Sequence, residues 1–160
     1  MNNTIKVGMA DANVCRPPDS ITTLGLGSCV GIVLYDPVKK IAGLVHVMLP
    51  DSTKIMNNTN KYKFADTGID ALIEDMAKLG AVKRNLVAKI AGGAQMFSFN
   101  NLEMMRIGER NVEATKDKLD RLSIRILAED TGANYGRTIV FSPETGLLHI
   151  RSVGKELKVL

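Results

Sequence analysis

The stretch CVGIVLYDPVKKIAGLVHVML, residues 29–49, carries the strongest structural signal in this chain. Two apolar runs rich in β-branched residues, at 29–36 and 41–49, flank the short polar segment PVKK. Apolar runs of this length on either side of a proline-containing turn are typical of a β-hairpin. The two runs are therefore expected to pair as antiparallel strands.

The length of the hairpin loop determines which residues of the two strands face each other. In an antiparallel pair, the position numbers of opposed residues add to a constant. That constant is 75 for a two-residue loop at Pro37-Val38 or a four-residue loop from Asp36 to Lys39, and Asp36-Pro37 suits the start of a type I turn, which favours the longer loop. Cys29 and His46 would then be directly opposed, with Cβ atoms about 4.5–5.5 Å apart. A loop of three or five residues would send the two side chains to opposite faces.

A cysteine beside a histidine is the basic unit of thiol catalysis, and here the cysteine follows a glycine-rich segment. The imidazole of His46 would take the thiol proton of Cys29 and later protonate a leaving group. Backbone N–H groups around Gly27, Ser28 and Cys29 would stabilise an oxyanion. From spacing alone, a buried cysteine and a hydrogen-bonded strand histidine remain the alternative.

The rest of the chain predicts further strands and two helices. Apolar runs predict strands at 4–10, 85–91, 124–130, 137–142 and 147–153, the last two joined by PETG. Helical spacing predicts one helix that is capped by Asp66 and ends at Gly80, and a second from Glu109 to Leu122. Residues 13–20 and 51–63 are expected to be loops, the latter mobile, and 92–101 a flexible segment. This order predicts one domain, residues 1–160, with an α/β sandwich in which the helices cover a largely mixed sheet.

Composition and charge narrow the classes of function. The chain has 160 residues, 45% hydrophobic, and a net charge of +4, but its cations are interleaved with acids and no aromatic platform accompanies them. Nucleic-acid binding is therefore not expected. No apolar run approaches the roughly 20 residues that cross a bilayer, and the N-terminus lacks a signal-peptide layout, so membrane insertion is not expected either. Only Cys15 and Cys29 are present, which favours the cytoplasm.

Neither a cofactor nor a metal is expected. Gly92-Gly93 lacks the strand-to-helix phosphate fingerprint and is interpreted as a turn or a close backbone approach. No cluster of His, Cys and Asp has metal-ligand spacing, and Cys29 with His46 alone makes a poor zinc site.

Five segments of the chain, in order, resemble the chemoreceptor glutamine deamidase family, CheD. They are TLGLGSCV (23–30), VHVMLPDS (45–52), AKIAGGAQMF (88–97), IGERNVEA (107–114) and LAEDTGANYGR (127–137). The resemblance runs from about Gly8 to Val153. It implies a three-layer α/β/β sandwich similar to the catalytic domain of cytotoxic necrotizing factor.

The resemblance also implies an activity. Family members hydrolyse glutamine side-chain amides on methyl-accepting chemoreceptors to glutamate and ammonia, in chemotaxis adaptation. The catalytic cysteine, histidine and threonine of the family map onto Cys29, His46 and Thr23, and a CheC-type phosphatase is the implied partner. A binding module that docks and regulates that phosphatase, with catalysis secondary, is the alternative. A cysteine protease or transglutaminase would share the first chemical step.

Several other residues are assigned structural roles. Asp51, in LPDS, is expected to turn the chain at the rim of the site rather than to orient His46. His149 alternates with apolar neighbours and is expected to be structural, and Cys15 is incidental. A shallow, open cleft is expected, and the loops able to rim it are 24–28, 50–63, 92–101 and 131–137.

Overall fold

The computed structural model describes residues 2–96 and 106–160, and within these ranges ten strands form two five-stranded sheets. The first sheet has the order β1-β3-β8-β9-β10, and the second has the order β2-β5-β4-β6-β7. The strands are β1 (Thr4–Val7), β2 (Ala12–Cys15), β3 (Ser20–Leu26), β4 (Val30–Asp36), β5 (Ile41–Val47), β6 (Val87–Gly92), β7 (Arg125–Thr131), β8 (Arg137–Ser142), β9 (Leu147–Arg151) and β10 (Lys158–Val159). Each sheet is mixed, because β1–β3 and β6–β7 are parallel and the other pairs are antiparallel.

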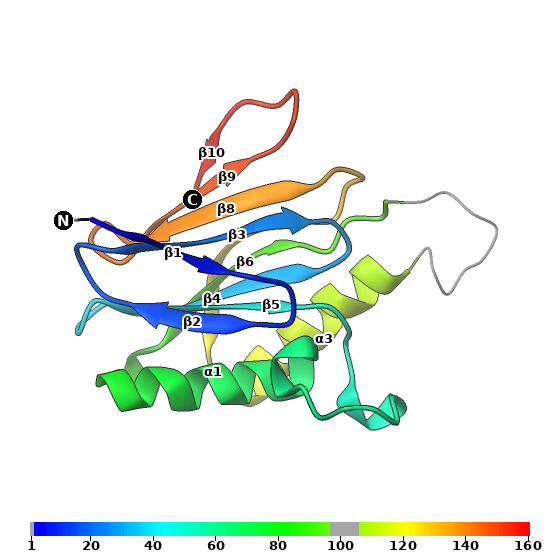
Figure 1. Ribbon diagram of the computed structural model, residues 1–160, viewed down its shortest axis with the longest axis horizontal. Coiled ribbons are helices and arrows are strands. Elements are labelled where there is room, and N and C mark those ends of the chain that lie inside the picture. The colour runs from blue at the N-terminus through cyan, green and yellow to red at the C-terminus, as the bar shows by residue number, and fades with distance from the viewer. Residues whose placement is uncertain (1, 97–105) are drawn as a thin grey trace.

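Two helices, α1 (Ala65–Leu79) and α3 (Ile107–Arg121), cover the free face of the second sheet (Figure 1). One apolar core lies between these helices and the sheet, and it includes Ile32 and Leu34 of β4. A second core lies between the two sheets and includes Val33, which points from β4 in the opposite direction. The central strands are therefore buried on both faces, and the predicted mixed α/β class with two helices is confirmed.

The β4–β5 hairpin is present, but the predicted register is wrong by two positions. Gly31, not Cys29, is directly opposite His46, and the position numbers of every pair add to 77. The four-residue loop runs from Pro37 to Lys40 because Asp36 remains in the strand, paired with Ile41. Its buried carboxylate accepts hydrogen bonds from the N–H groups of Val38 and Lys39, at 3.0 Å each, and so closes the turn from its first residue.

Helix α1 begins and ends close to the predicted positions, but its first turn differs from the prediction. The N-cap residue is Phe64, without a side-chain cap bond. Asp66 instead accepts from the N–H (3.0 Å) and hydroxyl (2.7 Å) of Ser52, and so anchors the preceding loop. Gly80 ends the helix as predicted, with a φ of +114° that favours glycine. None of the helices within the described ranges is long and apolar enough to cross a bilayer.

Three strands, β2, β3 and β10, were not predicted, because the sequence of each is atypical of a strand. β2 occupies part of the expected loop 13–20, where Pro17 and Pro18, two and three positions after the last residue of the strand, favour a loop in the sequence. β3 runs through the glycine-rich segment, and its register against β8 shifts between Thr23 and Leu26, where Gly25 has a φ of +69°. β10 has only two residues.

The structure describes the expected loops 51–63 and 92–101 to different extents. The expected loop 51–63 contains the short 3₁₀ helices Ser52–Lys54 and Lys61–Lys63, and a third, Lys83–Asn85, precedes β6. The expected flexible segment 92–101 lies outside the described residues from position 97 onward.

Candidate active site

His46 lies in the middle layer of the molecule, with its side chain between the two sheets. It is fully buried on β5, and the residue opposite it on β4 is Gly31. A Cβ at Gly31 would lie 2.8 Å from Ile139 Cδ1 and 3.0 Å from Leu26 Cδ1, both of the first sheet. The absence of a side chain at Gly31 therefore lets the two sheets approach closely beside the imidazole.

Thr23 holds the imidazole from the facing sheet. Its hydroxyl oxygen lies 2.7 Å from His46 Nδ1 and 2.7 Å from the carbonyl oxygen of Val7. The hydroxyl has one proton, and the carbonyl can only accept, so Thr23 donates to Val7 and accepts from Nδ1–H. This pattern places the proton of neutral His46 on Nδ1 and leaves Nε2 as an acceptor. Nε2 is buried and has no hydrogen-bond partner among the described residues.

Cys29 lies in the bend between β3 and β4, at the end of the hairpin that carries His46. Because Gly31 is opposite His46, Cys29 lies two positions beyond the direct partner, diagonal to the histidine and just outside β4, which begins at Val30. Strand alternation does not fix the side chain of a residue in this bend, but Cys29 packs against the apolar core between the two sheets, the gap into which His46 points. The predicted direct opposition of Cys29 and His46 is wrong. Cys29 is half-buried.

Burial shifts both groups toward their neutral forms. It raises the pKa of the Cys29 thiol above its ordinary value, and the opposing effect of the residue's own N–H does not reverse this. It lowers the pKa of His46 below its ordinary value. At neutral pH the structure therefore favours a thiol and a neutral imidazole over a thiolate–imidazolium pair.

The bend at residues 27–29, here called the cysteine loop, has three consecutive carbonyl groups that each accept a hydrogen bond. The carbonyl of Gly27 accepts from Ala94 N–H (2.8 Å), that of Ser28 from Asn111 Nδ2 (2.9 Å), and that of Cys29 from Gly93 N–H (2.8 Å). In a trans peptide the N–H points opposite to the carbonyl, so the N–H groups of Ser28 and Cys29 point away from these donors. Among the described residues, neither N–H donates to another residue's acceptor.

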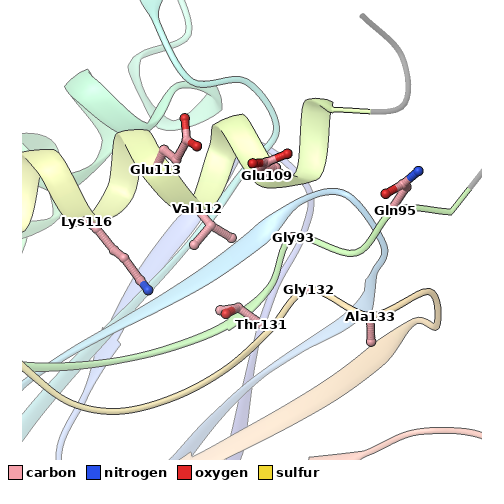
Figure 2. A pocket seen from close by; sticks show the side chains of 9 residues that line it. All are labelled: Gly93, Gln95, Glu109, Val112, Glu113, Lys116, Thr131, Gly132 and Ala133. Carbon is pink, nitrogen blue, oxygen red and sulfur yellow. The ribbon is translucent and has the colours of Figure 1, made fainter. Parts of the chain in front are cut away.

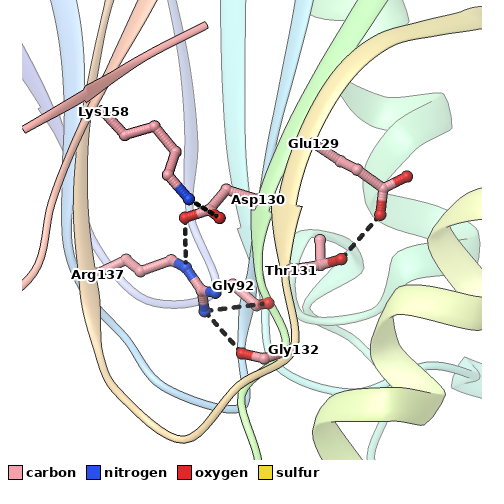
Figure 3. Close-up of polar contacts among 7 residues, drawn as sticks. All are labelled: Gly92, Glu129, Asp130, Thr131, Gly132, Arg137 and Lys158. Carbon is pink, nitrogen blue, oxygen red and sulfur yellow. Dashed lines mark hydrogen bonds and ion pairs between the residues drawn. The ribbon is translucent and has the colours of Figure 1, made fainter.

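The segment that supports the cysteine loop, residues 92–94, is held by the buried Arg137, whose guanidinium forms an ion pair with the half-buried Asp130 (3.0 Å; Figure 3). Gly92 has a φ of +113°, and a Cβ there would collide with the Cys29 carbonyl oxygen, which confirms the predicted close backbone approach. The buried Arg137 guanidinium donates to the carbonyl of Gly132 (3.0 Å) and contacts that of Gly92 (3.5 Å). Burial alone would raise the pKa of Asp130, but hydrogen bonds and charges from Lys158 and Arg137 hold it below its ordinary value.

Residues 92–96 of the predicted rim loop 92–101 lie beside the cysteine loop and contact the predicted rim loop 131–137. Gln95 N–H donates to the Ala133 carbonyl (2.9 Å), and both residues border a cavity of about 290 Å³ that Figure 2 shows. Helix α3 closes the other side of this cavity with Glu109, Val112, Glu113 and Lys116. A second cavity, of about 580 Å³, is bordered by Gly25 and by residues 135–138. Cys29 and His46 border neither cavity.

Comparison with known proteins identifies the family. The chain matches the family model described as CheD chemotactic sensory transduction over residues 48–152. A probable chemoreceptor glutamine deamidase CheD of Lachnoclostridium phytofermentans is 70% identical over 159 residues, which cover 99% of both chains. The chain belongs to the CheD family. The probable deamidase CheD of Caldanaerobacter subterraneus is 60% identical over 98% of this chain and 97% of its own. The chemoreceptor glutamine deamidase CheD of Halalkalibacterium halodurans is 59% identical over 96% of both.

The other residues considered from the sequence lie outside this CheD-family site. Asp51 accepts from the N–H (2.9 Å) and hydroxyl (2.6 Å) of Thr53 and turns the chain, as predicted. His149 is half-buried on β9, opposite Val140. Cys15 is buried, and burial followed by the charge of Asp19 raises its pKa to about 12. No group of three or more His, Cys, Asp and Glu in the described ranges is arranged to hold a metal ion.

One residue of the site, Asn111, was missed by sequence reasoning. It lies in the family segment IGERNVEA, on the buried stripe of α3 that includes Gly108, Thr115 and Leu119. The predicted stripe consists of the apolar residues Val112, Leu119 and Leu122, and it therefore does not include the polar Asn111. The available sequence signal is spacing: Asn111 lies eight positions before Leu119, which places both on one helix face, and a polar group on the buried face needs a hydrogen-bond partner.

Proposed function

We propose that this CheD-family chain hydrolyses glutamine side-chain amides on bacterial chemoreceptors to glutamate and ammonia, with Cys29 as the nucleophile. The observation that carries the proposal is the Thr23–His46 hydrogen bond, because it leaves His46 Nε2 as an unpartnered acceptor between the two sheets, where Cys29 also packs, among the residues that the structure describes. Family membership supplies the reaction, since the relatives are named chemoreceptor glutamine deamidases.

In the first step, the Cys29 sulfur attacks the amide carbon while His46 Nε2 takes the thiol proton. A new C–S bond forms and the carbonyl oxygen becomes an oxyanion. The diagonal placement requires the two side chains to close when substrate binds, and catalytic hydrogen bonds are often long before that point. Because the resting pair is neutral, proton transfer accompanies the attack instead of preceding it.

The N–H groups of Ser28 and Cys29, with Gly27 providing space beside them, stabilise the oxyanion. Their carbonyls are already anchored, so these donors are fixed before the substrate arrives. Donors that need no reorganisation are the most effective at stabilising a developing charge. When the oxyanion collapses, the C–N bond breaks and His46 gives its proton to the departing ammonia.

The resulting thioester is hydrolysed by water alone, so the proposed reaction uses no cofactor. His46 Nε2 removes a proton from the attacking water, and the C–S bond then breaks as the proton returns to sulfur. Thr23 acts throughout by accepting from Nδ1–H, which keeps the basic nitrogen directed at the reaction. This assigns Thr23 a positioning role that threonine can fill with one hydroxyl oxygen.

We place the protein in the cytoplasm, with chemoreceptors as substrate and a CheC-type phosphatase as partner. Both cysteines are free, which suits a reducing compartment. The competing proposal, a docking module whose catalysis is secondary, predicts normal phosphatase binding but no essential thiol.

The experiment is incubation of the protein with membranes that contain chemoreceptors, followed by mass spectrometry of receptor peptides. We expect a glutamine-to-glutamate mass change with the native chain and none with Cys29→Ala. His46→Ala should lower the rate at least by about 10²–10⁴-fold. Cys15→Ala is the matched control, since it removes a thiol outside the site and should retain full activity. Retained activity in Cys29→Ala would refute the thiol mechanism.

A further inference from the structure

Asn111 joins the two segments that carry the cysteine and the histidine. It is fully buried, and its Nδ2 donates one hydrogen bond to the carbonyl of Ser28 (2.9 Å) and one to the carbonyl of Met48 (3.0 Å). Ser28 immediately precedes Cys29, and Met48 lies two residues beyond His46. One side chain of α3 therefore ties the cysteine loop to the end of the histidine strand.

The orientation of the Asn111 amide follows from its partners. Both partners are carbonyl oxygens, so the nitrogen must face them, because the oxygen would be repelled. Asn111 Oδ1 is buried and has no partner among the described residues. A buried unpaired acceptor opposes folding, which offsets part of the stabilisation from the two Nδ2 hydrogen bonds.

Helix α3 is seated closely enough for this short side chain to reach the loop. Gly108, one turn earlier on the same helix, lies so near the backbone of Gly93 and Ala94 that a Cβ would collide with both carbonyl oxygens. Gly93 and Ala94 are the residues whose N–H groups hold the carbonyls of Cys29 and Gly27. Helix α3, residues 92–94 and the cysteine loop thus form one packed unit. Asn111 donates to Ser28, the middle one of the three anchored carbonyls.

We propose that Asn111 is a positioning residue that aims the Cys29 N–H at the oxyanion. The Ser28 carbonyl and the Cys29 N–H belong to one planar peptide unit and point in opposite directions. By holding the carbonyl toward α3, Asn111 turns the N–H toward the side on which substrate would lie. This inference rests on the proposed thiol mechanism, and it adds a residue that touches neither substrate nor the reacting atoms.

Two substitutions and one control test the proposal. Asn111→Asp keeps the shape but loses the two N–H donors, and Asn111→Ala removes the side chain. Thr115→Val is the control, because Thr115 is buried one turn later on the same stripe and its hydroxyl bonds the Asn111 carbonyl of its own helix (2.8 Å). Each variant is compared with the native chain in receptor deamidation and in alkylation of Cys29 by iodoacetamide.

We expect both Asn111 variants to lower kcat about 10²-fold with an unchanged KM, the size of loss that a small misplacement of catalytic groups produces. Alkylation needs the thiol but no oxyanion donor, so its rate should not change. Thr115→Val should retain kcat. Unchanged kcat in folded Asn111 variants would overturn the proposal, as would an equal loss of alkylation, which would place the effect on the thiol itself.

A measurement on the native chain applies even where the variants do not fold. Nuclear magnetic resonance of ¹⁵N-labelled protein should show both Asn111 side-chain amide protons protected from exchange with solvent, since each is hydrogen-bonded and buried. Rapid exchange of either proton would contradict the proposal. Failure of the thiol mechanism can be told apart from failure of the Asn111 proposal. If the thiol mechanism is wrong, Cys29→Ala retains deamidation, and this result does not depend on the Asn111 variants.

Discussion

The Thr23 hydroxyl lies 2.7 Å from His46 Nδ1, across the gap between the two sheets. The same hydroxyl donates to the carbonyl of Val7, its neighbour in the parallel β1–β3 pair. A side chain that has already given its only proton to a carbonyl can serve the imidazole only as an acceptor. The hydrogen bonding of the first sheet therefore determines which nitrogen of a histidine in the second sheet is basic.

Replacement of Thr23 tests this relationship. Thr23→Ser retains the hydroxyl and should retain most activity, whereas Thr23→Val has nearly the same shape and lacks the acceptor. We expect Thr23→Val to lower kcat by about 10²-fold, less than loss of Cys29 or His46, because the imidazole keeps its packing but not its fixed tautomer. Steady-state kinetics of receptor deamidation measure this, and equal activity of the serine and valine variants would contradict it.

A second prediction concerns how the rates of deamidation and of Cys29 alkylation depend on pH. Burial holds the pKa of His46 below its ordinary value and that of Cys29 above it, so His46 is protonated only in acid. Deamidation should fall as pH decreases through the lowered pKa of His46, below about 6.5, and should not fall between there and about pH 8. Alkylation by iodoacetamide should accelerate steadily above about pH 8, as the raised pKa of Cys29 is approached.

The matched control is the second thiol. Cys15 is buried and its pKa is raised to about 12, so Cys29→Ala should leave the folded chain almost unreactive. A plateau of alkylation already reached near pH 6 would instead indicate a preformed thiolate–imidazolium pair and would contradict the neutral resting state.

His46 also affects the free energy of unfolding. Because the pKa of His46 is lower in the folded chain than in the unfolded chain, its stabilising contribution is complete above about pH 6.5 and is lost as pH falls toward the folded pKa.

The hairpin illustrates what the sequence could and could not specify. Two apolar runs and a proline-containing turn predicted both strands, but the predicted direct opposition of Cys29 and His46 was wrong. The register was wrong by two positions because Asp36 was assigned to the loop. In the structure its buried carboxylate also accepts from the N–H of Val82 (2.9 Å), a tertiary contact that turn statistics do not contain.

The site was only partly predictable for a similar reason. Cys29, His46 and Thr23 lie in segments with recognisable motifs, so the sequence alone identifies them as candidates. The link from Thr23 to His46 crosses between sheets, and the link from Asn111 to Ser28 spans 83 positions of the chain. Such contacts depend on how the layers stack, and β3 itself was concealed by the glycine at its bulge.

A third prediction follows from the carboxylate that fixes the hairpin. Burial alone would raise the pKa of Asp36, but hydrogen bonds from Val82, Lys39, Asn85 and Val38 outweigh burial and hold it below its ordinary value. Asp36→Ala should therefore lower the free energy of unfolding by about 3 kcal/mol, since it removes several bonds to a charged group. Urea unfolding at pH 7 measures this loss.

The pH dependence of unfolding provides the check on that assignment. A carboxyl with a lowered folded pKa stabilises the fold above its unfolded pKa of about 3.9, and this stabilisation is lost as pH falls through the folded value. The difference between the native chain and Asp36→Ala should therefore be constant near neutrality and should shrink in acid. A difference that stays the same at pH 3 and pH 7 would exclude the carboxylate as the cause.

The last prediction concerns the proposed phosphatase partner. A deamidase for receptors must accept a glutamine on a protein surface, and Gly25, Gln95 and Ala133 of the predicted rim loops border the two cavities. If receptor and phosphatase share this surface, each weakens the apparent binding of the other. Titrating a CheC-type phosphatase into receptor deamidation should then inhibit, and additional receptor should relieve the inhibition. Cys29→Ala allows the same competition to be followed as binding without turnover. An unchanged deamidation rate with the phosphatase demonstrably bound would mean that the two proteins use separate surfaces.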